Sequence, residues 1–139
     1  MKGLLIKANG ISEIVEFPEK DKLGWYYETL GCDCIDIVAP YGVDEIAKKH
    51  DMRSIVGKFC LVVDDEGMLK DEPVVNPIAS LMYGCDIHGQ ALFGDVLVGA
   101  NLETEDGVET VGLTDNDIWL LEVSVNALID QHNERVKSS

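Results

Sequence analysis

Hydrophobic and polar residues alternate in short runs along the first part of the chain. This pattern predicts strands over Gly3–Lys7 and Glu13–Phe17. The dipeptide Asn9-Gly10 lies between them and favours the positive φ angles of a tight hairpin turn. Apolar residues then recur at helical spacing between Leu23 and Leu30, which predicts a short helix closed by Gly31.

The middle of the chain repeats this alternation of strand and helix patterns. Cys32–Val38 has one apolar face at a period of two residues, so we expect a strand there. Val43–Met52 has helical spacing, and Phe59–Val63 is a continuous apolar run typical of a buried strand. A turn at residues 65–67 predicts that Met68–Lys70 returns beside that strand.

Capping and turn residues define the next elements. Asn76 followed by Pro77 is typical of a helix start, and Gly84 predicts the end of a two-turn helix. Two further strands are expected over Val96–Leu102 and Val108–Leu113, with a hairpin turn between them at residues 105–107.

The last predicted element is a long helix. Residues 114–117 form a capping box, and helical spacing continues to about Val136. The first three turns are apolar nearly all round, so the helix must be covered on both sides by its own fold or covered by another subunit. We therefore predict a homodimer, with this helix at the contact. The expected contact residues are Ile118, Trp119, Leu120, Val123 and Ala127.

Together these elements predict one α+β domain over residues 1–139. We expect a small antiparallel or mixed sheet built of hairpins, with short helices and one long C-terminal helix. A chain of 139 residues can bury a core of its own without staples. The N-terminal apolar run is too short for a signal peptide and no stretch is long enough to span a membrane, so we expect a cytoplasmic protein.

Charge is distributed very unevenly along this sequence. The formal net charge is −15, and residues 71–134 contain thirteen carboxylates and neither lysine nor arginine. A field of this sign repels nucleic acid and membrane surfaces and attracts basic partners. Direct nucleic-acid binding and membrane binding are therefore not expected.

The acidic half of the chain suggests a function in binding. A folded array of carboxylates can compete with nucleic-acid phosphates for a basic groove, so we predict a non-enzymatic protein that blocks a basic, nucleic-acid-binding host protein. The alternative is that the acid excess only keeps the protein soluble. The expected acidic surface consists of Asp86, Asp95, Glu103, Glu105, Asp106, Glu109, Asp115 and Asp117.

Two other functions are compatible with the sequence. A dimer could sequester a nucleotide immune signal, in which case a pocket would have to use the one basic cluster, with Asp95 as a polar anchor at its mouth. A structural or regulatory module is the third possibility. The basic cluster consists of Lys48, Lys49, Arg53 and Lys58.

Candidate catalytic and metal-binding residues form no convincing pattern. Cys32 and Cys34 with Cys85 and His88 make a nominal zinc set, but the spacing lacks the paired knuckles of structural zinc sites. We expect reduced, inert cysteines. Neither a nucleophile elbow nor a phosphate-binding glycine loop is present, so we expect no enzyme activity, cofactor or metal.

Several segments resemble one known family. Phe59–Lys70, Pro73–Ala79, Phe93–Gly99 and Leu113–Ile118 are similar to the family catalogued as domain of unknown function 3846. The resemblance implies a small α+β protein of phages, prophages, conjugative plasmids and gut bacteria with no established enzyme activity, and it supplies no catalytic residues. Residues 43–56 look longer here than in typical members.

Overall fold

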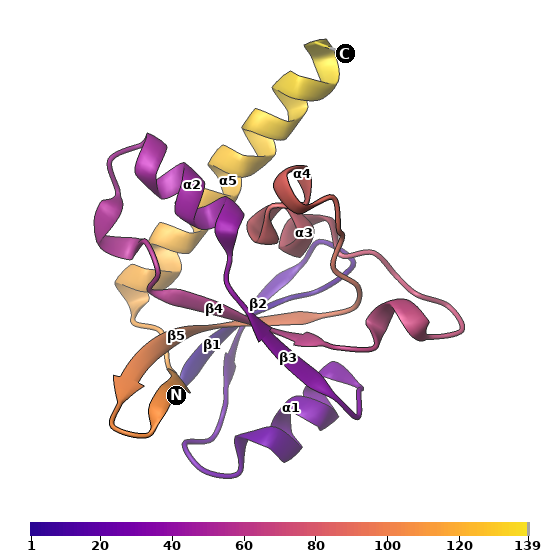
Figure 1. The fold of residues 1–139 in the computed structure, drawn as a ribbon, viewed down its shortest axis with the longest axis vertical. Helices are drawn as coiled ribbons and strands as arrows, with labels where there is room; N and C mark the ends of the chain where they lie inside the picture. The colour runs from indigo at the N-terminus through magenta and orange to yellow at the C-terminus, as the bar shows by residue number, and fades with distance from the viewer. Residues whose placement is uncertain (139) are drawn as a thin grey trace.

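A computed structural model describes residues 1–138, without the side chain of His88 (Figure 1). Its centre is one antiparallel sheet of six strands in the order β2-β1-β5-β4-β3, and β6 also pairs with β5. The strands are β1 (Lys2–Ile6), β2 (Ser12–Glu16), β3 (Ile35–Val38), β4 (Phe59–Asp64), β5 (Val96–Thr104) and β6 (Gly107–Val111).

Strand β5 organises this sheet. Its first half pairs with β1, with Leu5 opposite Leu97, and its second half pairs with β6 on the same side. Its other edge pairs with β4, where Cys60 lies opposite Gly99. A Cβ atom at Gly99 of β5 would lie 2.7 Å from the side chain of Thr110 on the paired strand β6. Glycine avoids this close contact.

Helices cover both faces of the sheet (Figure 1). Most of them pack on one face, where β1, β4 and β5 form the larger core, and α1 covers the other face with a smaller core built on Phe17, Tyr26 and Leu97. The helices are α1 (Lys22–Leu30), α2 (Tyr41–Lys49), α3 (Pro77–Tyr83), α4 (Cys85–His88) and α5 (Asp115–Ser138), with short 3-10 turns η1 (Arg53–Ile55) and η2 (Gly67–Leu69).

The structure confirms the predicted α+β class, the hairpins and the long C-terminal helix. The predicted return of Met68–Lys70 as a strand is wrong, because residues 67–69 form the 3-10 turn η2. Both edges of β4 are already paired, with β3 and β5, so no edge is open to a returning strand.

Helix α5 is the longest element, and its last turns project beyond the body of the molecule (Figure 1). Its start is capped as expected, since the Thr114 hydroxyl accepts a hydrogen bond from Asp117 N–H at 3.1 Å and Asp117 Oδ2 accepts one from Thr114 N–H at 2.9 Å. Among the described residues, no helix is both long enough and apolar enough to cross a membrane.

Candidate functional site

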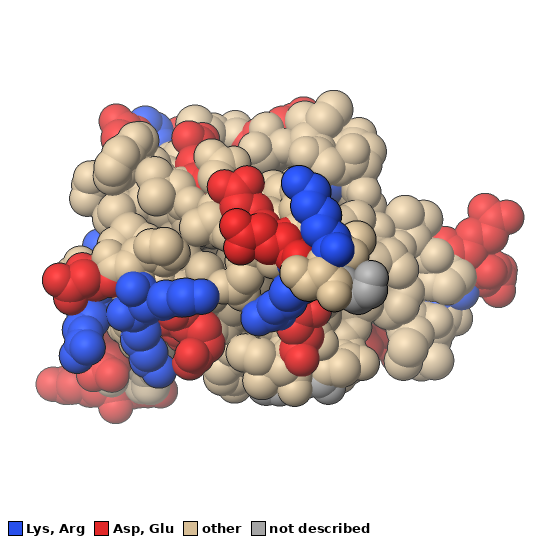
Figure 2. All heavy atoms as spheres, turned by 90° about the horizontal axis from the view of Figure 1, so that it is seen from above, with Lys and Arg blue, Asp and Glu red and all other residues tan. Residues whose placement is uncertain are grey.

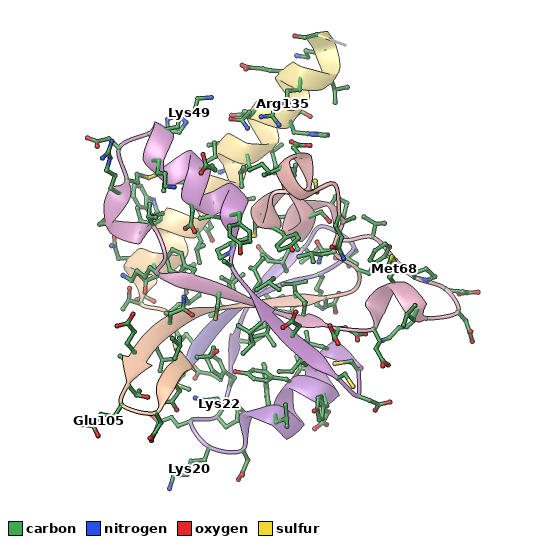
Figure 3. All side chains as sticks on the ribbon, viewed as in Figure 1. Lys20, Lys22, Lys49, Met68, Glu105 and Arg135 are labelled. Atoms are coloured by element: carbon green, nitrogen blue, oxygen red, sulfur yellow. The ribbon has the colours of Figure 1, made fainter. Side chains whose placement is uncertain are left out.

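The tip of the β5–β6 hairpin carries exposed carboxylates. Glu103, Glu105 and Asp106 are exposed and enter no ion pair with the described part of the chain. Figure 3 shows Glu105 pointing away from the body of the molecule. Glu103 lies opposite Val108, whereas the neighbouring Glu109 lies opposite Leu102, so Glu103 and Glu109 project from opposite faces of the strand pair. The hairpin therefore surrounds its tip with charge and does not form a line of carboxylates on one face.

Three other residues of the expected acidic surface are neutralised by cations from distant parts of the chain. Lys2 lies 2.9 Å from Asp115, and Lys22 lies 3.0 Å from Glu109. Arg135 pairs with Asp86. The fold therefore supplies these three carboxylates with counter-charges from outside residues 71–134, a span that contains neither lysine nor arginine.

Asp117 is not a surface residue at all. It is only 2% exposed, and its Oδ1 atom lies 2.6 Å from Lys58 Nζ. Burial would raise the pKa of Asp117, but the hydrogen bonds from Lys58 and Thr114 outweigh it and hold the pKa below its ordinary value. Asp117 therefore caps a helix and pairs with Lys58, and its placement on a binding surface is corrected.

Asp95 has a structural contact at the start of β5. Its Oδ1 atom accepts a hydrogen bond from Ala8 N–H at 3.0 Å, which ties the first hairpin turn to the central strand. The side chain is half-buried, and it does not line the groove described below. This contact accounts for the carboxylate without a ligand.

A second acidic surface, not anticipated from the sequence, forms where β3 meets the end of β4. Ile35 lies opposite Asp64, and Asp65 N–H donates to Cys34 O at 3.1 Å, so carboxylates flanking β3 and following β4 come together. They border a recess of about 520 Å³, which we call the acidic recess. Its lining includes Glu28, Asp33, Asp64, Glu66 and one cation, Lys70.

Lys70 is held inside the acidic recess. Its ammonium lies 3.0 Å from Asp64 and donates to Gly31 O at 2.7 Å. The other lining carboxylates, Glu28, Asp33 and Glu66, are exposed and have no ion pair within residues 1–138. One lysine thus faces four carboxylates.

Carboxylates around this recess raise the pKa of the Cys34 thiol. Glu66 is the largest cause that raises its pKa, followed by burial and by Asp65, Asp33 and Asp64. Negative charges oppose formation of a thiolate, so the shift indicates a field that favours cations. The acids after β4 and the acids flanking β3 are visible in the sequence. The recess could not be predicted from them, because the sequence does not show that β3 and β4 pair with each other.

Only part of the predicted basic pocket assembles. Lys48 and Lys49 line a groove of about 450 Å³ between α2, the α3–α4 turn and α5, and Arg135 joins them there. Arg53 and Lys58 do not line this groove: Arg53 lies 3.9 Å from Asp51, and Lys58 pairs with Asp117. We call this site the helical groove.

The end of the molecule that contains the helical groove is nearly balanced in charge. Figure 2 views this end and shows lysine and arginine side chains interleaved with acidic ones. We count as this end the segment 41–55, helix α4 and the part of α5 from residue 130 onward. Its cations are Lys48, Lys49, Arg53, Arg135 and Lys137, and its carboxylates are Asp44, Glu45, Asp51, Asp86, Asp130 and Glu134. The remainder of the chain has six cations against twenty carboxylates, so the field of the protein comes from that remainder.

Most of the residues predicted at the dimer contact instead pack in or against the core of their own chain. Ile118 is 5% exposed and belongs to the main core, and Leu120 and Ala127 pack partly buried against that core. Val123 is half-buried, whereas Trp119 is 60% exposed. Placing Ile118 at a subunit contact is therefore wrong, and Trp119 is the expected contact residue that remains available.

The cysteines do not converge. Cys32 packs on the α1 side of the sheet, Cys60 lies within β4, and Cys85 starts α4 on the opposite side from Cys32. Among the described side chains, no group of three or more histidine, cysteine, aspartate or glutamate residues could hold a metal ion.

Comparisons with known proteins give no relative. No family model, no curated protein and no solved structure matches the chain. Membership of the family that the sequence resembles stays a prediction.

Proposed function

We propose that this protein is a non-enzymatic binding protein that offers carboxylates to a basic partner, of the kind that normally holds nucleic acid. The observation that carries the proposal is the acidic recess, where four carboxylates surround a concave surface with one internal lysine. Concave surfaces of a single charge sign focus the electrostatic field and attract ligands of the opposite sign. The exposed acids at the β5–β6 tip add negative charge on a separate part of the molecule.

Lys70 indicates how such a partner would bind. A lysine ammonium already lies against Asp64 and a backbone carbonyl, and the remaining carboxylates of the recess are open to further lysine or arginine groups. Leu69 lines the recess and is 77% exposed, and the preceding residue, Met68, is also exposed. Basic side chains flanked by apolar ones would therefore find both kinds of contact here.

Fewer carboxylates are available for phosphate mimicry than the sequence predicted. Asp86, Glu109, Asp115 and Asp117 are paired with the chain's own cations, so they contribute little net charge to a partner. The proposal therefore depends on Glu28, Asp33 and Glu66 in the recess and on Glu103, Glu105 and Asp106 at the hairpin tip.

Displacement of DNA tests this function. A fluorescent DNA duplex is bound to the basic nucleic-acid-binding fraction of a bacterial lysate, and loss of anisotropy is followed as the protein is added. We expect displacement that weakens steeply with salt. The variant Glu28→Gln, Asp33→Asn, Glu66→Gln should lose roughly tenfold or more in potency.

The control is a hairpin variant with the same change in charge: Glu103→Gln, Glu105→Gln, Asp106→Asn. We expect it to lose less potency than the recess variant. Equal losses would show that only net charge matters, and absence of displacement by the unmodified protein would overturn the proposal.

A further inference from the structure

In the lining of the helical groove, three cations outnumber two carboxylates. Ile46 and Leu128 are buried and form its apolar floor together with Leu81. The exposed side chains of Lys48, Lys49 and Arg135 lie at its rim, against the carboxylates of Glu45 and Asp86. Figure 3 shows Lys49 and Arg135 at neighbouring ends of α2 and α5.

The rim cations have partners that an incoming anion can replace. Lys48 lies 3.4 Å from Glu45, and Lys49 donates to the Gln131 amide oxygen at 3.3 Å, both at the surface. Exposed pairs of this kind contribute little to stability. Arg135 is bound more closely, to Asp86, so Asp86 competes with any anion for this guanidinium.

Charge explains why an anion would bind here and not elsewhere. The end of the molecule around the groove is nearly neutral, whereas the rest is strongly negative and repels anions. The guanidinium of Arg135 presents a fork that matches phosphate or carboxylate oxygens, and the lysines add point charges beside it. The volume of about 450 Å³ lies within the range of small-molecule sites.

We propose that the helical groove binds a small organic anion with an apolar body. The phosphate or carboxylate head would contact Lys49 and Arg135, and the body would pack against Ile46, Leu81 and Leu128. This site lies on a different part of the molecule from the acidic recess, and it does not depend on the function proposed above.

Titration with the fluorescent probe 8-anilinonaphthalene-1-sulfonate tests the site, since the probe combines an aromatic body with an anionic head. We expect saturable binding to the folded protein, weakened at least fivefold by Lys49→Gln and by Arg135→Gln. Arg53→Gln removes the same charge from the same end of the molecule but outside the groove, and it should change the affinity less than twofold. All three side chains are exposed, so the variants should fold.

Asp86→Asn should change the affinity for the probe in the opposite direction. Removing the carboxylate frees Arg135, so the probe should bind more tightly. Competition by adenosine monophosphate or by decanoate then separates a phosphate ligand from a carboxylate ligand. Absence of saturable probe binding, or equal affinities in Lys49→Gln, Arg135→Gln and Arg53→Gln, would overturn the proposal.

Discussion

Asp117 shows how one side chain can combine two structural roles. Its carboxylate accepts the Thr114 N–H at the start of α5 and also pairs with Lys58 while buried. The capping role was predictable from four consecutive residues. The ion pair was not, because Lys58 reaches Asp117 only through the packing of β4, β5 and α5.

This pair predicts a stability change that depends on pH. Lys58→Met should lower the free energy of unfolding by about 1–3 kcal/mol near pH 7, because it leaves a buried carboxylate without its cation. The folded pKa of Asp117 lies below its ordinary value of 3.8, so the stabilisation is present above that value and is lost as the pH falls through the folded pKa. Chemical denaturation should therefore show the gap between the two proteins narrowing as the pH is lowered toward about 3.

Lys48→Met is the matched control for this prediction. Lys48 pairs with Glu45, and both side chains are exposed, Lys48 at 55%, so its loss should cost less than about 0.5 kcal/mol. Similar losses in the two variants would contradict the account of the Lys58–Asp117 pair.

Cys34 allows the potential of the acidic recess to be measured chemically. Its thiol is exposed, yet Glu66 and the neighbouring acids raise its pKa, so less thiolate is present at a given pH. We expect iodoacetamide to alkylate Cys34 more slowly than free cysteine, and Glu66→Gln to speed the reaction severalfold. Cys85 serves as an internal reference, because burial is the largest cause of its raised pKa and Glu66 is not among the causes. No acceleration at Cys34 would argue against a focused negative field.

At the scale of elements, local signals predicted most of the fold. Asn76 and Pro77 start α3 as expected, and Asn76 Oδ1 accepts the Ala79 N–H at 3.0 Å. The strand order was not predictable, because β1 and β5 pair in the sheet although most of the chain separates them in sequence. The acidic recess remained hidden for the same reason, since it requires β3 and β4 to lie side by side.

The packing of helix α5 indicates which of its residues would lie at the contact of the predicted homodimer. Ile118 is buried in the main core and Leu120 packs partly buried against it, so Trp119 is the most exposed of the expected contact residues. We expect Trp119→Lys to convert a dimer to monomers in sedimentation without loss of stability, because the side chain is 60% exposed. Leu69→Lys places the same charge at another exposed apolar site and should leave association unchanged. A monomeric unmodified protein at high micromolar concentration would contradict this prediction.

At the scale of the whole molecule, folding redistributes the charge that the sequence appears to segregate. Lys2 and Lys22 come from the N-terminal part and neutralise Asp115 and Glu109, while the acids around β3 and β4 concentrate in the acidic recess. Counting charges along the chain correctly indicated an acidic protein. It could not locate the surface where carboxylates remain available, because that depends on long-range ion pairs.

The most direct test of the central claim is a map of where basic side chains bind. Amide chemical shifts of the isotope-labelled protein are recorded by NMR during titration with an oligolysine peptide. We predict the largest changes at Glu28, Asp33, Cys34 and Glu66, around the acidic recess, with disappearance of these changes at high salt. Changes confined to the β5–β6 tip, or spread evenly over all exposed acids, would contradict the account.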